Sequence, residues 1–516
     1  MKRTLFILSI VTVLLSGCYE DKGNYDYVDV NTVTIDVPES VTITLIDELT
    51  LDPKLTYSNP EDTEGFTFEW RENTNTISNE RKLVYRPTKT GPTRLELYVR
   101  DRNGIGYRTV TSVTVNSPYK WGYAILADKG NASTLHFVGR NNDTGEFIPY
   151  PDQYNKLFPG APLGTGPKKL SMTVIGSMDE LIIFQDNEDL ALHGFTLEKE
   201  LSLREEFPSL SYPGGAKMID GDYTLGLDVL LDDQGRIYTR PIDVGNILHY
   251  SYFIAEPKRF EKPGTFISQL IRSKAYACMS WMYDSGNNRL VALYSNSHPA
   301  TGDSFRYGAE LVISDEGNPE EFTSLNDLGE YRFVYSNFRM PYIGTLLCDY
   351  RNILKHSDGT YAVQSYRATR NATEVKLSNQ IQQPFIGTGI VTDNTLYEMR
   401  SDGQYMFFAE GSKLYMVEFR TSGDTEIQYL TLLNDFGKRI TVLQRGDNYT
   451  SAVNGHSIGI AVEGGTFYVL RTIDQMLISN DPWKEGKVLE MGNLGEVVDV
   501  IWKYGSTNSW FQDYSF

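Results

Sequence analysis

Cys18 is the side chain whose surroundings most clearly imply a chemical modification. It follows Ser16 and Gly17, behind an apolar run at residues 5–15 and a positively charged start at residues 2–3. The eleven-residue run is too short for a membrane span, which needs about 20 residues, and fits the core of a secretory signal peptide. A signal peptidase needs small residues before its cleavage site, and the Cys18 thiol is a nucleophile that can receive a diacylglycerol. We therefore predict that residues 1–17 are a signal peptide and that Cys18 carries lipid.

The segment at residues 15–18, Leu-Ser-Gly-Cys, resembles a bacterial lipobox. Glu20 and Asp21 then lie in an expected tether at residues 18–27, which resembles the acidic export signal of Bacteroidota surface lipoproteins. A multiply acylated N-terminus holds a protein more firmly than one acyl chain, which binds a membrane only marginally. The expected location is the outer membrane, lipid-anchored and facing the cell exterior. The alternatives are an ordinary signal peptide with an incidental cysteine, and a merely solvated linker.

A serine at the centre of Gly-His-Ser-Ile-Gly, residues 455–459, matches the G-x-S-x-G turn of serine hydrolases. That turn needs a helix after the serine, whereas the residues that follow Ser457 indicate two strands. The hydrolase order also needs a later histidine, and His456 is the last one in the chain. We interpret the match as coincidental.

The glycine-rich segment at residues 160–170 contains two lysines, the residue types of a phosphate-binding loop. Pro167 interrupts the pattern G-x-x-x-x-G-K-[ST] that such a loop needs. The segment is therefore predicted to be an exposed connection between blades.

The sequence predicts no metal site, no cofactor and no catalytic residues. Acidic turns at residues 186–189, 220–222 and 231–235 could hold calcium, but none forms the twelve-residue loop of a calcium hand. We interpret them as hairpin turns. The histidines are scattered, with no H-E-x-x-H motif and no pair four residues apart. They are His136, His193, His249, His298, His356 and His456.

Aromatic residues cluster at residues 249–253, 331–342 and 510–516. Their faces could stack on a sugar ring or a peptide, but packing between sheets uses the same residues. Cys278 and Cys348 are expected to be buried free thiols. Ligand-binding residues therefore stay unidentified at this stage.

The charge balance limits the partners of the chain. It has 516 residues, with 48 Lys and Arg against 67 Asp and Glu. Without Lys2 and Arg3 the mature chain has 46 positive and 67 negative side chains, a net charge of −21. Such acidity argues against nucleic acid and anionic lipid surfaces as partners.

Residues 28–116 are predicted to form one small β domain. Runs such as NTVTIDV, TRLELYVRD and YRTVTSVTV alternate apolar and polar residues between Pro, Gly and Asn turns. Six or seven such strands with Trp70 at the centre indicate an immunoglobulin-like sandwich. No cysteine pair flanks Trp70, so the domain is not of the antibody type.

Residues 118–516 repeat one pattern, an apolar strand, an acidic or glycine turn, and a second apolar strand. The first apolar residues after the turns lie 55, 47, 53, 71, 53 and 53 residues apart. Repeats of about 40–50 residues built from short strands are typical of a β-propeller. We predict an all-β chain whose second domain is a propeller of seven blades, with six or eight as alternatives. The seven positions are Leu135, Leu190, Ile237, Leu290, Tyr361, Leu414 and Phe467.

The last apolar run, residues 496–504, follows the seventh repeat without a partner. Because an unpaired sheet edge is a liability, we expect this run to return and complete the first blade. Tandem sandwich domains are the alternative fold, but they would repeat about every 90–100 residues.

Together, the lipobox, the start CYEDKGNYDY and the spacing from FTFEW to TGPTRLELYVRDRNG resemble the PKD-like family of Bacteroidota surface lipoproteins. The usual WDFGDG turn is replaced here by WREN. The resemblance implies an accessory role beside a TonB-dependent transporter of the SusC/SusD type, capturing peptides or glycans. Only Cys18 carries over as a functional position.

Three functions remain open. The preferred prediction is a non-catalytic lipoprotein, not an enzyme, whose propeller face captures a peptide or glycan beside the transporter and a SusD-like lipoprotein. The second is a propeller hydrolase or lyase, which would bring carboxylates or histidines with perturbed pKa values to the central funnel. The third is a structural subunit of the transporter complex, with a large apolar patch and no pocket.

Overall fold

The computed structural model describes residues 31–61, 63–141, 144–175, 178–223, 227–241, 251–271, 279–294, 308–315, 321–339, 347–371, 373–422, 425–446 and 456–504. In these residues the chain is all-β, with only brief helical segments. It divides into two compact units, Met1–Asn116 and Ser117–Phe516, and each has hydrophobic clusters of its own.

The first unit is built around a five-stranded sheet with the order β2-β9-β8-β5-β6. Trp70 of β5 is fully buried, and its indole N–H donates to the Arg81 carbonyl at 3.1 Å. The pairs β1-β4 and β3-β7 form two further small sheets. The strands are β1 (Val33–Asp36), β2 (Ser40–Thr44), β3 (Leu49–Leu51), β4 (Lys54–Tyr57), β5 (Thr67–Glu72), β6 (Asn75–Ser78), β7 (Leu83–Tyr85), β8 (Gly91–Arg100) and β9 (Gly106–Asn116).

The second unit contains seven sheets in its described residues, numbered here along the chain. Sheets 1 to 3 are β37-β10-β11-β12, β13-β14-β15-β16 and β17-β18-β19. Their strands are β37 (Glu496–Tyr504), β10 (Trp121–Lys129), β11 (Ala132–Arg140), β12 (Phe147–Tyr150), β13 (Pro167–Ile175), β14 (Met178–Gln185), β15 (Leu190–His193), β16 (Lys199–Ser202), β17 (Met218–Tyr223), β18 (Leu227–Asp232) and β19 (Ile237–Pro241).

Sheets 4 to 7 are β20-β21-β22-β23, β25-β26-β27-β28-β24, β29-β30-β31-β32 and β33-β34-β35-β36. Only β24, at the outer edge of sheet 5, pairs in parallel within these four sheets. The strands are β20 (Ile267–Ile271), β21 (Met279–Asp284), β22 (Arg289–Tyr294), β23 (Ala309–Glu310), β24 (Val312–Asp315), β25 (Tyr331–Arg339), β26 (Leu347–His356), β27 (Tyr361–Arg370), β28 (Glu374–Pro384), β29 (Leu396–Met399), β30 (Tyr405–Glu410), β31 (Lys413–Ser422), β32 (Thr425–Asp435), β33 (Ile440–Arg445), β34 (Ser457–Val462), β35 (Thr466–Arg471) and β36 (Lys487–Met491).

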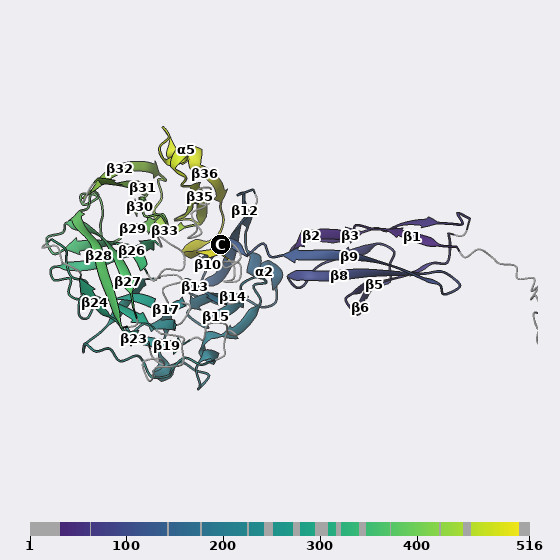
Figure 1. The fold of residues 1–516 in the computed structure, drawn as a ribbon, viewed down its shortest axis with the longest axis horizontal. Helices are drawn as coiled ribbons and strands as arrows, with labels where there is room; N and C mark the ends of the chain where they lie inside the picture. Colours follow the sequence, from purple (N-terminus) through teal and green to yellow (C-terminus); the bar gives the residue numbers. More distant parts are fainter. Residues whose placement is uncertain are drawn as a thin grey trace, which may run out of the picture. The chain divides into compact units, whose positions relative to one another are not determined.

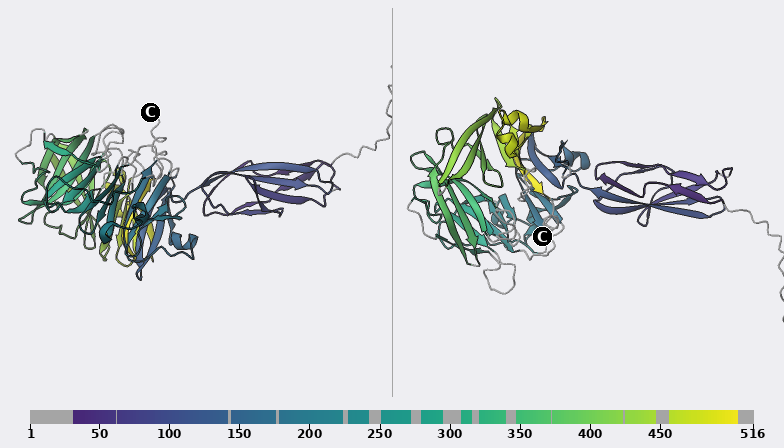
Figure 2. Two further views of the ribbon diagram at one scale, coloured as in Figure 1. Left: turned by 90° about the horizontal axis from the view of Figure 1, so that it is seen from below. Right: turned by 45° about the horizontal axis from the view of Figure 1, so that its top comes forward.

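Consecutive sheets of the second unit contact one another in a cycle. Strand β37 contacts both β13 and β33, and the contacts continue as β13–β17, β17–β20, β22–β24, β25–β29 and β29–β33. Figure 1 shows the sheets following one another around a common centre, and Figure 2 shows them from two further directions. This is an arrangement of the β-propeller type, in which each sheet is buried between its neighbours.

The C-terminal strand completes the first sheet, as the sequence predicted. Strand β37 pairs antiparallel with β10, and Trp502 lies opposite Tyr123 in the register. Their rings meet edge to face at 4.8 Å. The carboxylate of Asp499, also on β37, accepts the Leu170 N–H of sheet 2 at 2.8 Å.

The repeat predicted from the sequence corresponds to one structural position. Each of the seven residues that follow the turns lies on the third strand of a different sheet, and each is buried. The strands are β11, β15, β19, β22, β27, β31 and β35. The periodicity therefore records a hairpin that recurs once in every sheet.

Short helices interrupt the second unit where the sequence predicted none. Helices α4 (Asp474–Leu477) and α5 (Pro482–Gly486) connect β35 to β36, and α2 (Gln153–Leu157) follows β12. Trp483 of α5 packs on Phe436 at 4.9 Å and on Tyr468 at 5.7 Å. None of the helices in the described residues combines the length and apolar character needed to cross a membrane.

Candidate functional site

A cavity of about 640 Å³ lies between sheets 5 and 6. We call it the sheet 5–6 cavity. Strands β26, β27 and β28 form one wall, and β31, β32 and the turn after β29 form the other. Small-molecule sites commonly have volumes of about 300–1,000 Å³, so the cavity has the size of a binding site.

Arg351 of β26 lies at the interface between the two walls and is almost completely buried. Its Nε donates to the Ser365 hydroxyl at 3.1 Å, and its guanidinium also donates to Glu426 and to the Gly403 carbonyl. The guanidinium carbon lies 3.7 Å from the centre of the Phe419 ring, which places a cation over its π face. Arg351 therefore joins sheet 5 to sheet 6.

Asp349 and Arg367 form a second ion pair in the cavity. Arg367 Nε and Nη2 donate to the two carboxylate oxygens of Asp349 at 2.6 and 3.1 Å. Both side chains keep about 30% of their surface in solvent, 31% for Arg367 and 29% for Asp349. The pair therefore presents donors and acceptors side by side to anything that enters the cavity.

The opposite wall contains the carboxylate of Asp402. The Gln404 N–H and the Nε of Arg400 each donate to Asp402 Oδ1 at 3.0 Å. Burial opposes ionisation of this carboxyl, but the hydrogen bonds and charge of Arg400 outweigh that effect and lower the pKa of Asp402. The Nη1 of Arg400 also donates to the Thr472 carbonyl at 2.7 Å, which joins sheets 6 and 7.

The aromatic rings at the sheet 5–6 cavity are covered. Tyr350 and Tyr366 stack on each other at 5.5 Å and 14°, and each is only 2% exposed. Phe419 lies beneath Arg351. The accessible surface therefore consists mainly of paired charges and amides, which can exchange hydrogen bonds with a polar ligand.

Ser457, the serine of the G-x-S-x-G match, has a structural role. Ser457 begins strand β34, which continues into the hairpin with β35 and not into a helix. Its hydroxyl donates to the Gly446 carbonyl at 2.7 Å and lies 2.8 Å from the Tyr123 hydroxyl. The serine thus holds the contact between sheets 1 and 7, and its surroundings are not those of a nucleophile elbow.

The glycine-rich segment at residues 160–170 is a connection only as far as Gly166. Pro167 is the first residue of β13, so the end of this segment belongs to the innermost strand of sheet 2. No helix follows it, and the geometry of a phosphate-binding loop does not arise here.

Two of the three acidic segments are turns, and the third is a strand. Asp232 closes the β18–β19 turn by accepting the N–H groups of Gln234 and Arg236 at 3.0 and 2.8 Å. Residues 220–222 instead lie inside β17, which corrects the prediction of a turn. The Asp220 carboxylate accepts a hydrogen bond from Lys169 Nζ at 2.6 Å. A lysine of the neighbouring sheet 2 therefore neutralises this acid within the strand.

The remaining acidic segment, residues 186–189, lines a smaller cavity of about 170 Å³. Burial raises the pKa of Asp189 to about 6. Its oxygens accept the Gln185 N–H at 2.9 Å and the Tyr212 hydroxyl at 2.5 Å. In the ranges that the structure describes, no three His, Cys, Asp or Glu side chains are placed to hold a metal ion.

The described residues of the aromatic clusters are mostly core residues. Phe253 is fully buried and stacks on Phe207 at 5.6 Å, and Phe338 is buried between sheets 4 and 5. Cys348 is free and buried in that same cluster, where burial raises the pKa of its thiol to about 12. Other candidates lie outside the described residues, namely Cys18, Cys278, His249, His298 and residues 510–516.

The sequence reasoning did not identify the sheet 5–6 cavity. Asp349, Arg351, Ser365 and Arg367 alternate along two adjacent strands and point toward sheet 6. Charged residues at every second position of an otherwise apolar strand were the signal that could have found them.

Comparisons with known proteins give one sequence match. Residues 18–167 match the model of the PKD-like family, a span that covers the first unit and strands β10 to β12. No curated protein matches the chain.

Several solved structures match the chain at low similarity. A quinonprotein alcohol dehydrogenase-like protein from Bacteroides thetaiotaomicron is 14% identical, with a TM-score of 0.40 and coverage of 91% of this chain and 96% of that one. Prp20p from Saccharomyces cerevisiae is 10% identical, with a TM-score of 0.33 and coverage of 75% and 87%. The WD40 domain of SCAP from fission yeast is 10% identical, with a TM-score of 0.32 and coverage of 81% and 96%.

Proposed function

We propose that this chain, PKD-like over residues 18–167, is a lipid-anchored protein of the outer membrane that captures a glycan outside the cell. Cys18 carries the lipid, and the chain faces the cell exterior. It works without catalysis beside a TonB-dependent transporter of the SusC/SusD type and a SusD-like lipoprotein. The observation that supports glycan capture is the sheet 5–6 cavity with its exposed, paired charges.

In this proposal the second unit is a seven-bladed propeller and each sheet is one blade. The cycle of contacts between sheets supports the count, because each sheet meets the next and sheet 7 meets sheet 1. Strand β37 joins the two ends of the unit in one blade. The sheet 5–6 cavity then lies between two neighbouring blades.

The chemistry of the cavity favours a glycan over a peptide. Sugar hydroxyls both donate and accept, and the Asp349–Arg367 pair offers both functions within one planar arrangement. A peptide would need an open apolar pocket for side chains, whereas the nearby rings of Tyr350 and Tyr366 are buried. Recognition here relies on hydrogen bonds to hydroxyls and not on ring stacking.

The hydrolase or lyase alternative has one observation in its favour, the raised pKa of Asp189. Both oxygens of that carboxyl are engaged by Gln185 and Tyr212, as a structural carboxyl requires. The purely structural alternative would need a continuous apolar patch. The three most exposed large apolar side chains among the described residues, Ile478, Val312 and Leu210, lie in separate parts of the chain.

Binding of purified protein to a panel of soluble polysaccharides and peptides, measured by calorimetry, tests the ligand. We expect Arg367→Gln to weaken glycan binding at least tenfold, because it removes donors from the cavity. Arg332→Gln is the matched control, since Arg332 pairs with Asp393 on the surface outside the cavity. Peptide binding alone, turnover of a glycan, or equal loss in both variants would contradict the proposal.

Fractionation of cells tests the anchor separately. Cys18→Ser is expected to move the protein from the membrane fraction to the soluble fraction, because the acyl chains are lost. A serine variant that stays in the membrane fraction would show that something other than lipid holds the chain there.

A further inference from the structure

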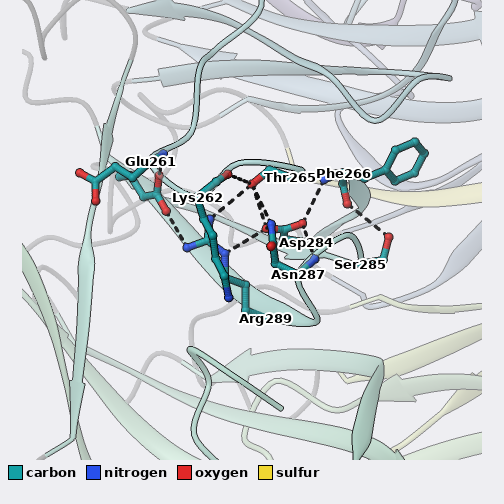
Figure 3. Close-up of polar contacts among 9 residues, drawn as sticks. Glu261, Lys262, Thr265, Phe266, Asp284, Ser285, Asn287 and Arg289 are labelled. Carbon is teal, nitrogen blue, oxygen red and sulfur yellow. Dashed lines mark hydrogen bonds and ion pairs between the residues drawn. The ribbon is translucent and has the colours of Figure 1, made fainter. Parts of the chain in front are cut away.

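A third cavity, of about 320 Å³, lies between the β18–β19 turn and the connection from β19 to β20. Figure 3 shows part of that connection, from Glu261 to Phe266, beside the polar contacts of Asp284. Three cations and one carboxylate line this cavity, which we call the cationic cavity. They are Arg236, Lys258, Arg259 and Glu256.

Two of the three cations of this cavity have no ion-pair partner among the described residues. In the part of the chain that the structure describes, neither Lys258 nor Arg259 forms an ion pair. Arg236 donates its Nε to Asp232 at 2.7 Å, but its buried Nη2 has no acceptor among the described residues. A protein with an overall charge of −19 therefore places two cations without ion-pair partners, and one free N–H donor of Arg236, at one cavity.

One of the two carboxylates that act on Lys258 is engaged elsewhere. Glu310 and Glu261 act on the Lys258 ammonium through space. The Glu310 carboxylate accepts hydrogen bonds from Arg289 Nη1 at 2.9 Å and from the Glu261 N–H at 3.0 Å. Arg289 Nε donates to Asp284 at 2.9 Å (Figure 3). This network keeps Glu310 occupied and leaves Lys258 without a close counter-charge.

The walls of the cavity strengthen the effect of these cations. Pro257 and Phe260 contribute apolar surface beside Lys258. Burial lowers the pKa of Lys258, because the loss of water around its ammonium outweighs the attraction of Glu310 and Glu261. An entering anion would offset that loss in a region where charge–charge attraction exceeds that in bulk water.

We propose that the cationic cavity binds an oxyanion, a carboxylate, sulfate or phosphate group, through Arg236, Lys258 and Arg259. The Arg236 Nη2 and the Arg259 guanidinium supply directional N–H donors, and Lys258 supplies a compact positive charge. The cavity lies at sheets 3 and 4, so this site is independent of the sheet 5–6 cavity and of glycan capture there.

Titration of the full-length protein with sodium sulfate, sodium phosphate and sodium glucuronate at constant ionic strength, against sodium chloride, tests the site. We expect saturable binding of at least one of the three anions with one site per chain. Lys258→Gln and Arg259→Gln should each weaken it about tenfold or more. Lys262→Gln should leave it within about twofold, because Lys262 is exposed and does not line the cavity.

A variant that removes a negative charge should increase anion affinity, and a gain in affinity cannot result from misfolding. Glu256→Gln removes the one carboxylate of the lining and should tighten binding about threefold or more. Binding of glucuronate alone would identify a uronic-acid ligand, and binding of sulfate or phosphate would identify an inorganic or esterified oxyanion. Absence of saturable binding by all three, or an equal loss in the Lys262→Gln control, would overturn the proposal.

Discussion

At the scale of single residues, several acids of the second unit are buried because many donors surround them. Asp284 is fully buried and accepts from the Phe266 N–H, the Thr265 hydroxyl, Asn287 and Arg289 (Figure 3). Such a residue closes the β21–β22 turn and fastens the preceding connection. The same residue type that suggested calcium in the sequence therefore acts as a structural acceptor.

Asp284→Ala is expected to destabilise the protein by about 3–5 kcal/mol, because Arg289 and two backbone N–H groups lose their acceptor. Unfolding in urea measures the change. Asp186→Ala is the control, because Asp186 pairs with Lys168 at the surface and is 61% exposed; its effect should stay below about 1 kcal/mol. Equal effects would show that burial of Asp284 contributes little.

His136 gives the fold a defined pH dependence. Its ring lies in the core, where Nδ1 accepts the Asp152 N–H at 2.9 Å, and burial lowers its pKa to about 4. The unfolded chain, with a pKa near 6.5, then binds the proton more tightly than the folded one. Stability is fully present above about pH 6.5 and falls by about 3 kcal/mol as the pH drops toward 4.

Urea unfolding at pH 7 and pH 5 measures this dependence. His136→Gln keeps an acceptor for the Asp152 N–H and should flatten the contribution across that range. His356, which is partly buried and whose pKa is raised by Asp358, gives a control substitution with no such loss. An imidazole of His136 that titrates near its ordinary value by NMR would contradict the prediction.

At the scale of elements, the closing strand is fixed by an ion pair as well as by its ladder. Lys503 of β37 and Asp179 of β14 meet at 2.6 Å, and both side chains are fully buried. Removal of either partner leaves an isolated charge in the interface between sheets 1 and 2. That situation costs far more than the loss of the attraction itself.

Lys503→Met is expected to destabilise the protein by about 3–5 kcal/mol, and the double variant Lys503→Met with Asp179→Leu should recover most of that loss. Denaturation of both single variants and the double variant gives the coupling energy. The exposed pair Lys487–Glu490 provides a control cycle, with an expected coupling below about 1 kcal/mol. Additive single effects at Lys503 and Asp179 would contradict the prediction.

The elements that the sequence predicted well are those fixed by local rules. A turn residue between two apolar runs is sufficient to define a hairpin, and all seven hairpins were located in this way. Strands β3, β4 and β6 lie outside the alternating runs predicted from the sequence, whereas β7, which is as short as β3, lies inside one. Helix α5 was missed because it is short, and its position depends on the packing of Trp483 against Phe436 and Tyr468.

At the scale of the whole molecule, the two compact units should behave as separate folding units. Each encloses clusters of its own, around Trp70 in the first unit and around residues such as Tyr123 and Trp502 in the second. We expect two thermal transitions in calorimetry, and we expect fragment 117–516 to reproduce one of them. A single cooperative transition that the fragment does not reproduce would contradict this.

Sites between sheets depend on the whole molecule, so a sequence pattern can mark the side chains of one wall but not the wall that they face. The sheet 5–6 cavity brings together residues 349–351, 365–367, 402–404, 419, 420 and 426, which meet only once the sheets are side by side. The cationic cavity similarly joins a turn to residues 256–265, which form no helix or strand. Spacing along the chain predicts the sheets, but it does not predict which side chains they place opposite each other.

Sheet 1 contains strands from both ends of the second unit, and this affects when the sheet can form during synthesis. Strand β10 leaves the ribosome nearly 370 residues before its inner neighbour β37, as Glu496 follows Lys129 so much later in the chain. The unit therefore cannot complete its first sheet before the last residues of β37 have been synthesised. A chain truncated before residue 496 would leave the edge of β10 unpaired. Proteases could recognise that edge, so incomplete chains should be degraded in preference to complete ones.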